Sequence, residues 1–175
     1  MTCKFSYWRQ ESPLGPLFVY KTSKGVCAID FLPLTPTLSP KGRGRRPALS
    51  GVEGVRGSQM KKDLRIAKQL NQYFQGKRKI FSVPIDLYGV SGFSKKVLQT
   101  LTHEVGFGQK ISYGELASRV GQPQAVRAVG QAMRKNPIPI VIPCHRVVAS
   151  DGSLGGYSAG LHRKKRLLMI EKTTV

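Results

Sequence analysis

Residues 112–137 read SYGELASRVGQPQAVRAVGQAMRKNP. Ser112 and Glu115 have the spacing of a capping box, which starts a helix, and this predicts a helix over 113–120. A Gly-Gln-Pro turn ends that helix, and a second helix over 124–135 stops before the next proline. Two short helices joined by a glycine-containing turn are the pattern of a helix-turn-helix, which also occurs in proteins that bind no DNA.

The second predicted helix carries little side-chain bulk. Four small residues lie along it, and two arginines interrupt the surface they form: Ala125, Ala128, Gly130, Ala132, Arg127 and Arg134. Such a helix can bring its backbone close to the wall of a DNA groove while an arginine reaches farther in. The helix therefore favours DNA binding more than the bare motif does.

The charge balance points to a polyanionic partner. Among 175 residues, 29 Lys+Arg against 9 Asp+Glu give a net charge of +20, which attracts nucleic acid or an anionic membrane surface. No apolar run approaches the roughly 20 residues needed to span a bilayer. The N-terminus also lacks the features of a secretory signal. We expect a globular cytoplasmic protein with no membrane association.

Three cysteines, Cys3, Cys27 and Cys144, are far apart in the sequence and cannot all pair. A disulfide framework is therefore not expected, and a reducing compartment is the simpler interpretation. There is no Cys-x-x-Cys motif, and the three histidines lie at no recognised ligand spacing. We predict no metal and no cofactor.

The N-terminal part predicts a small sheet with one helix. Two apolar stretches, 17–20 and 26–31, are separated by a short polar turn and predict a hairpin. Apolar residues recur at helical spacing over 60–74. An extended stretch and a glycine-rich linker follow, which divides the chain into domains at 1–91 and 92–175.

Residues 35–57 differ from the sequence on either side. They contain several prolines and glycines, five basic residues and a single acidic one, and so supply +4 of the net charge. This composition predicts a disordered loop. It could be a basic arm that holds DNA, but we favour a neutral insertion because added loop length costs little stability.

Residues 137–143, Pro-Ile-Pro-Ile-Val-Ile-Pro, predict a buried strand or strap that brings Cys144 to the edge of the core. The next two residues are His145 and Arg146. Nearby positive charge lowers a thiol pKa from about 8.5 and makes the sulfur nucleophilic. We therefore expect Cys144 to be a reactive nucleophile.

Adjacent residues of an extended segment point to opposite faces, so we expect His145 to reach the sulfur through a bridging water. A carboxylate on the far ring nitrogen would hold the imidazole in the required tautomer. Glu171, in a predicted last helix over 161–171, is the main candidate for this role. Asp151 remains an alternative.

A set of ordered motifs resembles the O6-alkylguanine-DNA alkyltransferase family, which consists of single-use DNA repair proteins. The resemblance is dense over about 93–171, with weaker support from 12–17 and 70–76. The motifs that carry it are Pro143-Cys-His-Arg146 followed by two valines, Ala128-Val-Gly-Gln-Ala-Met133, Asn136-Pro137 and Gly155-Gly-Tyr-Ser158.

The resemblance implies a mixed α/β fold. A small N-terminal, ribonuclease H-like domain would precede a mostly helical C-terminal domain with a winged-helix-like helix-turn-helix. It also implies that a monomer flips O6-alkylguanine, and O4-alkylthymine, out of double-stranded DNA. The alkyl group would pass irreversibly to Cys144, so that this methylated-DNA–protein-cysteine S-methyltransferase is consumed stoichiometrically.

The resemblance also assigns roles to individual residues. Cys144 would be the acceptor, His145 its water-linked base and Glu171 the orienting group. Arg127 would fill the gap left by the flipped base, and Tyr113 would push the target phosphate and hydrogen-bond the guanine ring. Further residues would tie the recognition helix to the pocket (Asn136), line the pocket and read the base (Val147, Gly155, Gly156, Tyr157, Ser158) or lie near phosphates (Ser94, Ser150).

Three other functions compete with this hypothesis. Non-catalytic lesion sensors related to the family lack the cysteine that this chain has. A helix-turn-helix regulator fits poorly with a single pocket, and a Cys-His hydrolase normally needs direct contact between the two side chains. The chain departs from the family in the 35–57 insertion, in Leu98 where many members have Trp, and in an incomplete zinc-binding set around Cys3 and Cys27.

Overall fold

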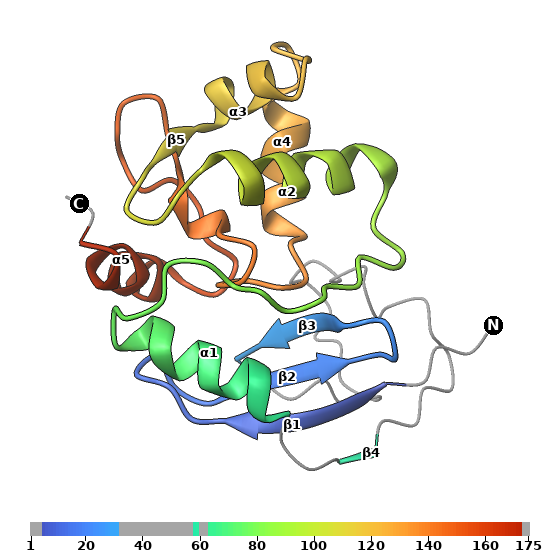
Figure 1. The fold of residues 1–175 in the computed structure, drawn as a ribbon. Helices are drawn as coiled ribbons and strands as arrows, with labels where there is room; N and C mark the ends of the chain where they lie inside the picture. Colours follow the sequence, from blue (N-terminus) through green and yellow to red (C-terminus); the bar gives the residue numbers. More distant parts are fainter. Residues whose placement is uncertain (1–4, 32–57, 60–62, 173–175) are drawn as a thin grey trace.

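The computed structural model describes residues 5–31, 58–59 and 63–172 (Figure 1). A small sheet with one helix forms the N-terminal part, and the C-terminal part is mostly helical. The mixed α/β fold expected from the sequence is therefore confirmed. Cys3 and the predicted loop at 35–57 lie outside the described residues.

The sheet has the strand order β3-β2-β1-β4. The predicted hairpin is β2 (Leu17–Lys21) paired antiparallel with β3 (Val26–Asp30). Strand β1 (Ser6–Gln10), which the sequence did not predict, pairs antiparallel with β2 and parallel with β4 (Ser58–Gln59).

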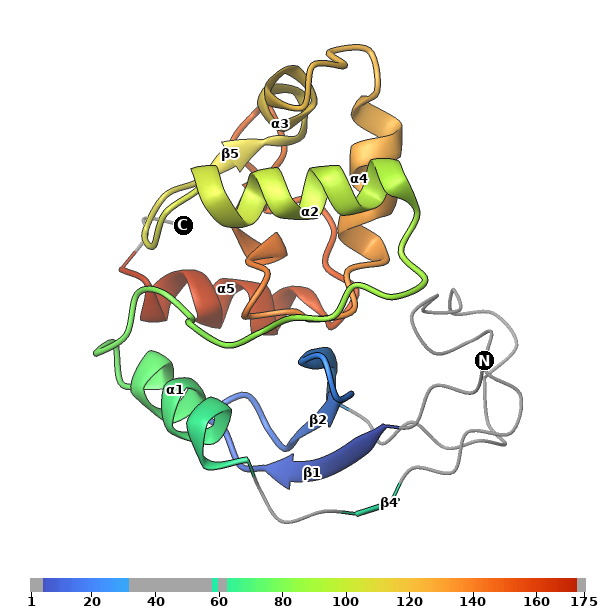
Figure 2. The ribbon, with the colours of Figure 1, turned by 45° about the vertical axis from the view of Figure 1, so that its right-hand side comes forward.

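Helix α1 (Leu64–Phe74) packs on one face of this sheet (Figures 1 and 2). Asp63 caps its first turn by accepting a hydrogen bond from the backbone of Arg65. The helix buries one stripe of side chains, spaced three or four residues apart as an amphipathic helix requires: Ile66, Ala67, Leu70 and Tyr73.

The C-terminal part follows the predicted order of helices, with ends that differ by one or two residues. The Ser112–Glu115 capping box is present, but the connection between the paired helices runs over six residues, 120–125, and is longer than the predicted turn. The elements are α2 (Gly92–Glu104), β5 (Ile111–Ser112), α3 (Tyr113–Arg119), α4 (Val126–Arg134), the 3-10 helix η1 (Cys144–Arg146), β6 (Val147–Val148) and α5 (Leu161–Ile170).

The two parts share one hydrophobic core, which runs from the inner face of the sheet into the helices around α4. Strand β3 joins them through its backbone. The Ile29 amide donates to the Pro137 carbonyl at 2.9 Å, and the Val26 amide donates to the Pro84 carbonyl at 2.9 Å. The segment before η1 and the extended segment around Pro84 therefore both lie along the same sheet edge.

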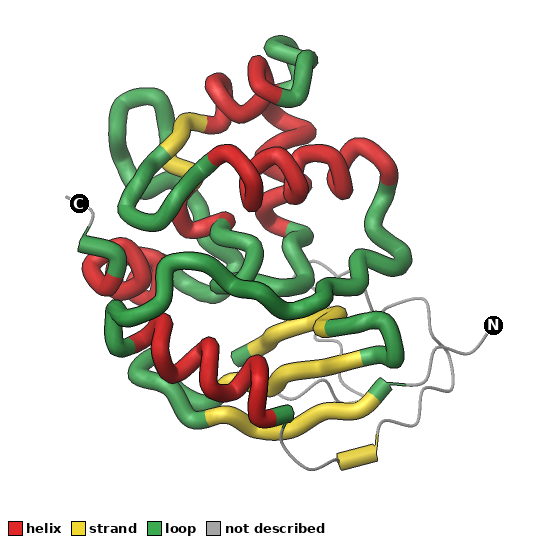
Figure 3. Tube along the Cα trace, viewed as in Figure 1, coloured by secondary structure: helices red, strands yellow, loops and turns green. Residues whose placement is uncertain are grey.

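Residues 137–143 are a buried strap and not a strand. Apart from η1, the chain between α4 and β6 is loop (Figure 3). The Ile142 amide donates to the Ile138 carbonyl at 2.9 Å, which closes a turn in which Ile140 has a φ of 77°. A β-branched residue at positive φ is strained, and the burial of the whole strap holds it there. In the described part of the chain, no helix could cross a membrane.

Candidate active site

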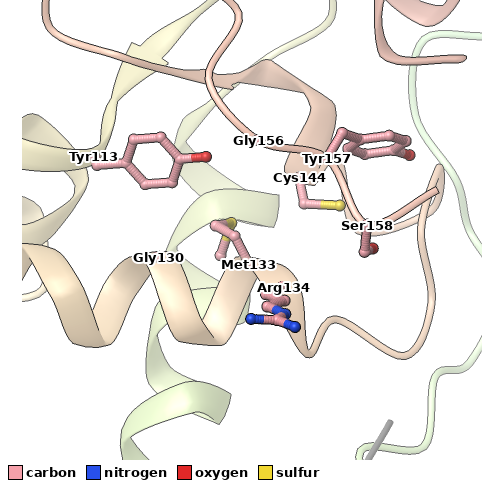
Figure 4. Close-up of a pocket in the computed structure, with 8 residues that line it drawn as sticks. All are labelled: Tyr113, Gly130, Met133, Arg134, Cys144, Gly156, Tyr157 and Ser158. Carbon is pink, nitrogen blue, oxygen red and sulfur yellow. The ribbon is translucent and has the colours of Figure 1, made fainter. Parts of the chain in front are cut away.

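A pocket of about 310 Å³ opens between α4, the start of α3 and the loop after β6 (Figure 4). Its volume is at the low end of small-molecule sites, which suits a ligand the size of a single nucleobase. Its lining contains Cys144 and four other residues that the sequence assigned to the site, in the full set Tyr113, Gly130, Met133, Arg134, Cys144, Gly156, Tyr157 and Ser158.

Cys144 begins the 3-10 helix η1 directly after the strap and is 5% exposed. The sequence argument that Cys144 and His145 alternate along an extended segment was therefore wrong. The Cys144 amide donates to the Ile142 carbonyl at 2.8 Å, so the preceding turn fixes the backbone of the cysteine. The thiol reaches the pocket while the next two side chains turn into the interior.

His145, Arg146 and Glu171 form a buried cluster behind Cys144. Glu171, the C-cap of α5, is the centre of the cluster. Its Oε1 accepts from His145 Nε2 at 2.8 Å, Tyr73 Oη at 2.7 Å and Arg146 Nη2 at 3.0 Å. Its Oε2 accepts from Arg146 Nε at 2.9 Å and from the Gly108 amide at 3.1 Å. Five donors thus hold one carboxylate group.

This geometry determines the state of the histidine. Burial by itself raises the pKa of Glu171, but hydrogen bonds from His145 and Arg146 outweigh burial and bring the pKa to about 2. A carboxylate only accepts hydrogen bonds, so His145 Nε2 carries the ring proton. Burial lowers the pKa of His145 below its ordinary value of 6.5, despite opposing contacts from Glu171. The ring is therefore a neutral imidazole at neutral pH.

The other nitrogen of His145, Nδ1, is then a lone-pair acceptor. It is buried, and no described residue hydrogen-bonds to it. Asp151, the alternative orienting residue, is exposed. Its side chain accepts a hydrogen bond from the Ser153 amide at 2.9 Å, and no hydrogen bond joins it to His145. Of the two carboxylates that the sequence left open, Glu171 is the one that lies against His145.

Tyr113, the first residue of α3, lines the pocket and directs its hydroxyl toward the space beside Cys144 (Figure 4). Burial is the main cause that raises the pKa of Tyr113 above 10.0, and the negative charge of a Cys144 thiolate is a smaller cause in the same direction. The phenol therefore remains protonated and can donate. Gly155, at a φ of +61°, packs against this ring, since a Cβ there would lie 3.3 Å from Tyr113 Cε2.

Helix α4 buries Val129, Ala132 and Met133 and exposes its opposite face. Ala132 thus lies in the core and not on the small-residue surface expected from the sequence. Arg127 is on the exposed face outside the pocket lining, whereas Arg134 lines the pocket.

Comparison with known proteins identifies the chain. The family profile "6-O-methylguanine DNA methyltransferase, DNA binding domain" matches residues 92–173, and "6-O-methylguanine DNA methyltransferase, ribonuclease-like domain" matches residues 6–87. The chain belongs to the methylated-DNA–protein-cysteine methyltransferase family.

Its relatives span distant organisms. The methylated-DNA–protein-cysteine methyltransferase of Cricetulus griseus is 38% identical over 98% of this chain and 83% of its own length. The Methanosarcina barkeri protein of the same name is 36% identical over 94% and 96%. The crystal structure of Mycobacterium tuberculosis OGT in complex with DNA has a TM-score of 0.79 and 34% identity, and covers 95% of this chain and 93% of that one.

In this methyltransferase, Asn136 links α4 to the strap that carries the cysteine. The residue is 3% exposed. Its side-chain amide donates to the Ile142 carbonyl at 2.9 Å, and its carbonyl oxygen accepts from the Ile138 amide at 3.0 Å. One side chain thus satisfies two buried backbone groups of the strap.

We expect Asn136→Ala to destabilise the methyltransferase by about 1–3 kcal/mol for each backbone group left unpaired. Urea unfolding of the variant and the wild type measures the difference. Gln131→Ala, an exposed substitution on the same helix, is the matched control and should stay within about 0.5 kcal/mol. Equal stability of the two variants would contradict the assigned contacts.

Lys164 is a site residue that the sequence reasoning missed. Its side chain is fully buried, and its Nζ donates to the Val147 carbonyl at 2.5 Å and to the Leu154 carbonyl. Burial lowers its pKa from 10.5 to about 8, while a negative charge on Cys144 opposes that shift. The sequence did contain a signal for its burial, because Lys164 lies on the apolar face of the last helix, three residues before Leu167.

Lys164 changes the electrostatic account of the methyltransferase cysteine. The sequence assigned the positive charge near the thiol to Arg146 and His145. Arg146 is bound to Glu171 and donates to the Val105 carbonyl at 2.5 Å, and His145 is neutral, so neither supplies free positive charge. The two partners of Lys164 Nζ are neutral carbonyls, and its ammonium group therefore attracts a Cys144 thiolate.

Two other predicted site residues, Ser94 and Ser150, lie outside the pocket lining of the methyltransferase. Ser94 is in the first turn of α2 and Ser150 is exposed in the loop after β6. Leu98, which departs from the family, is 1% exposed and packs in the common core. Among the residues that the structure describes, no group of three or more His, Cys, Asp or Glu side chains could hold a metal ion.

Proposed function

We propose that this protein repairs DNA by accepting an alkyl group from damaged duplex DNA onto Cys144. The proposal rests chiefly on one observation, that Cys144 lines a pocket the size of a nucleobase with the His145–Glu171 pair directly behind it. The base must leave the stack to reach a pocket of this kind. O6-Alkylguanine is the proposed main lesion, and O4-alkylthymine a second one.

The hydrogen bonds of the site define the path of the thiol proton. The Cys144 thiol gives its proton through a water molecule to His145 Nδ1, the ring nitrogen that no described residue binds. Glu171 stabilises the imidazolium that forms. The ammonium group of Lys164 stabilises the thiolate before attack.

Alkyl transfer is a displacement at carbon. The sulfur of Cys144 forms a bond to the alkyl carbon as the bond from that carbon to O6 breaks, and the electron pair moves onto the guanine. Tyr113 donates its phenolic hydrogen bond to the guanine ring and so offsets the developing negative charge. The product is a thioether, and no described residue around it offers a way to cleave it, so each chain reacts once.

The other site residues act on the DNA. Arg127, on the exposed face of α4, fills the gap left by the flipped base, and Ser94 and Ser150 lie near phosphates. Val147, Gly155, Gly156, Tyr157 and Ser158 hold the base in the pocket. The functional unit is proposed to be one chain, because the acceptor, base and orienting carboxylate all come from one polypeptide. The proposed compartment is the cytoplasm, as expected from the sequence.

The test is intact mass after incubation with a duplex that contains one O6-methylguanine. We expect one methyl adduct per chain even with excess duplex, and peptide mapping should place it on Cys144. The same duplex with unmodified guanine should give none. Repeated turnover, or no adduct at all, would contradict the proposal, and the second result would favour a non-catalytic lesion sensor.

A further inference from the structure

We infer that Tyr73, a residue of the N-terminal part of the chain, is a positioning residue for alkyl transfer. Its hydroxyl holds the carboxylate that orients the base, and it thereby makes the reactivity of Cys144 depend on the packing of α1 against the C-terminal helices. This inference rests on the proposed function and gives the N-terminal sheet and helix a part in the reaction.

The contact crosses between the two parts of the molecule. Tyr73 lies in the last turn of α1 and has no exposed surface. Its Oη donates to Glu171 Oε1 at 2.7 Å and lies 3.4 Å from His145 Nε2. A residue 98 positions away in the sequence therefore reaches the acid–base pair directly.

Aromatic packing fixes the Tyr73 ring. Its centroid lies 5.5 Å from Phe74, 5.4 Å from Phe81 and 6.1 Å from Phe107. Phe107 belongs to the turn between α2 and β5, so the ring is held from both parts of the molecule. Removal of the hydroxyl alone leaves these contacts in place, which separates the effect of the hydrogen bond from the effect of the ring.

The hydroxyl acts on the histidine through a shared oxygen. Glu171 Oε1 accepts from Tyr73 and from His145 at the same time, whereas Oε2 is held independently by Arg146 and Gly108. A donor on an anion disperses its charge and weakens its pull on other protons. Without the tyrosine hydroxyl, the carboxylate keeps its position but attracts the imidazole proton more strongly.

The sign of the effect follows from the groups that face His145. Burial lowers the pKa of His145, the Glu171 carboxylate at the end of α5 raises it, and Arg146 in η1 and Lys164 in α5 lower it. Tyr73 in α1 weakens the effect of Glu171. Loss of its hydroxyl therefore raises the pKa of His145 and leaves less neutral imidazole to accept the thiol proton at acid pH.

The experiment is the pH profile of the methyl-transfer rate constant for Tyr73→Phe and the wild type. We expect the acid limb to move to higher pH by about half a unit to one unit, with a roughly 3- to 10-fold slower reaction at pH values below the wild-type pKa of His145. The final yield of one adduct per chain should not change. Histidine NMR titration of labelled protein should show the same rise in the pKa of His145.

Tyr20→Phe is the matched control, because Tyr20 is also a buried tyrosine of the N-terminal part but packs with Cys27 and Ala28 away from the site. Its pH profile should equal that of the wild type. An unchanged acid limb in Tyr73→Phe, or equal slowing at every pH in both variants, overturns the inference. A wild-type chain that forms no adduct overturns the proposed function itself.

Discussion

A Cys144→Ser variant is expected to form no methyl adduct, with a transfer rate at least about 10⁴-fold below that of the wild type, the scale on which loss of a covalent nucleophile acts. A serine hydroxyl is far less acidic than a thiol of pKa about 8.5, so neither the ammonium of Lys164 nor the base His145 can generate the anion. Intact mass after prolonged incubation with the methylated duplex measures the effect.

The fold and DNA binding should survive this substitution, because serine has nearly the volume of cysteine and the backbone at 144 is held by the strap. Gel-shift affinity for the lesion duplex should equal that of the wild type. Cys27→Ser is the matched control, since Cys27 is a buried cysteine of β3 and lies outside the pocket lining. This control should still form one adduct, and an adduct on Cys144→Ser would show that another residue accepts the alkyl group.

A Glu171→Gln variant is expected to lose most of its transfer rate, by about 10³- to 10⁴-fold, on the scale seen when an orienting carboxylate becomes an amide. The amide can donate its own hydrogen to His145 Nε2, which moves the ring proton to Nδ1. The nitrogen that should take the thiol proton is then already protonated. Single-turnover kinetics with the O6-methylguanine duplex measure the loss.

The same substitution should destabilise the fold, because it leaves the buried guanidinium of Arg146 without its counter-ion. Removal of one partner of a buried ion pair costs about 3–5 kcal/mol, a large share of a typical stability of about 5–15 kcal/mol. Chemical unfolding measures the difference. Glu104→Gln, which breaks the exposed pair with Arg119, is the control and should change stability by less than about 0.5 kcal/mol.

The stability difference depends on pH in a defined direction. The pKa of Glu171 falls from 4.5 to about 2 in the folded state, so its stabilising contribution is complete above the unfolded pKa and is lost as pH falls through the folded one. The gap between wild type and Glu171→Gln should therefore be constant near neutrality and narrow between pH 4.5 and 2. A gap that widens in acid would contradict the assigned ionisation.

Several contacts join the N-terminal part of the chain to the residues around Cys144. Tyr73 contributes to the same carboxylate as His145, and the β3 edge binds the strap that carries Cys144. A guanidinium–aromatic contact adds to this, because Arg163 of α5 lies 4.3 Å above the Phe31 ring and donates to the Leu14 carbonyl at 3.2 Å. We therefore expect disturbance of the sheet to reach Cys144.

The sequence by itself was enough for the local features. Helices over 113–120 and 124–135, the hairpin and the last helix depend on capping, proline and apolar spacing, which act within a few residues. Their ends agree with the structure to within one or two residues. The proposed acceptor Cys144 and base His145 could also be named from the sequence, because the motif around them is contiguous.

Only the tertiary structure decided which distant groups meet. The choice of Glu171 over Asp151, the pairing of Arg146 with that carboxylate, and the approach of Lys164 and Tyr73 all depend on packing between segments far apart in the chain. Spacing along one segment carries no information on these contacts, since burial in a common core brings the groups together and removes the water that would otherwise screen them.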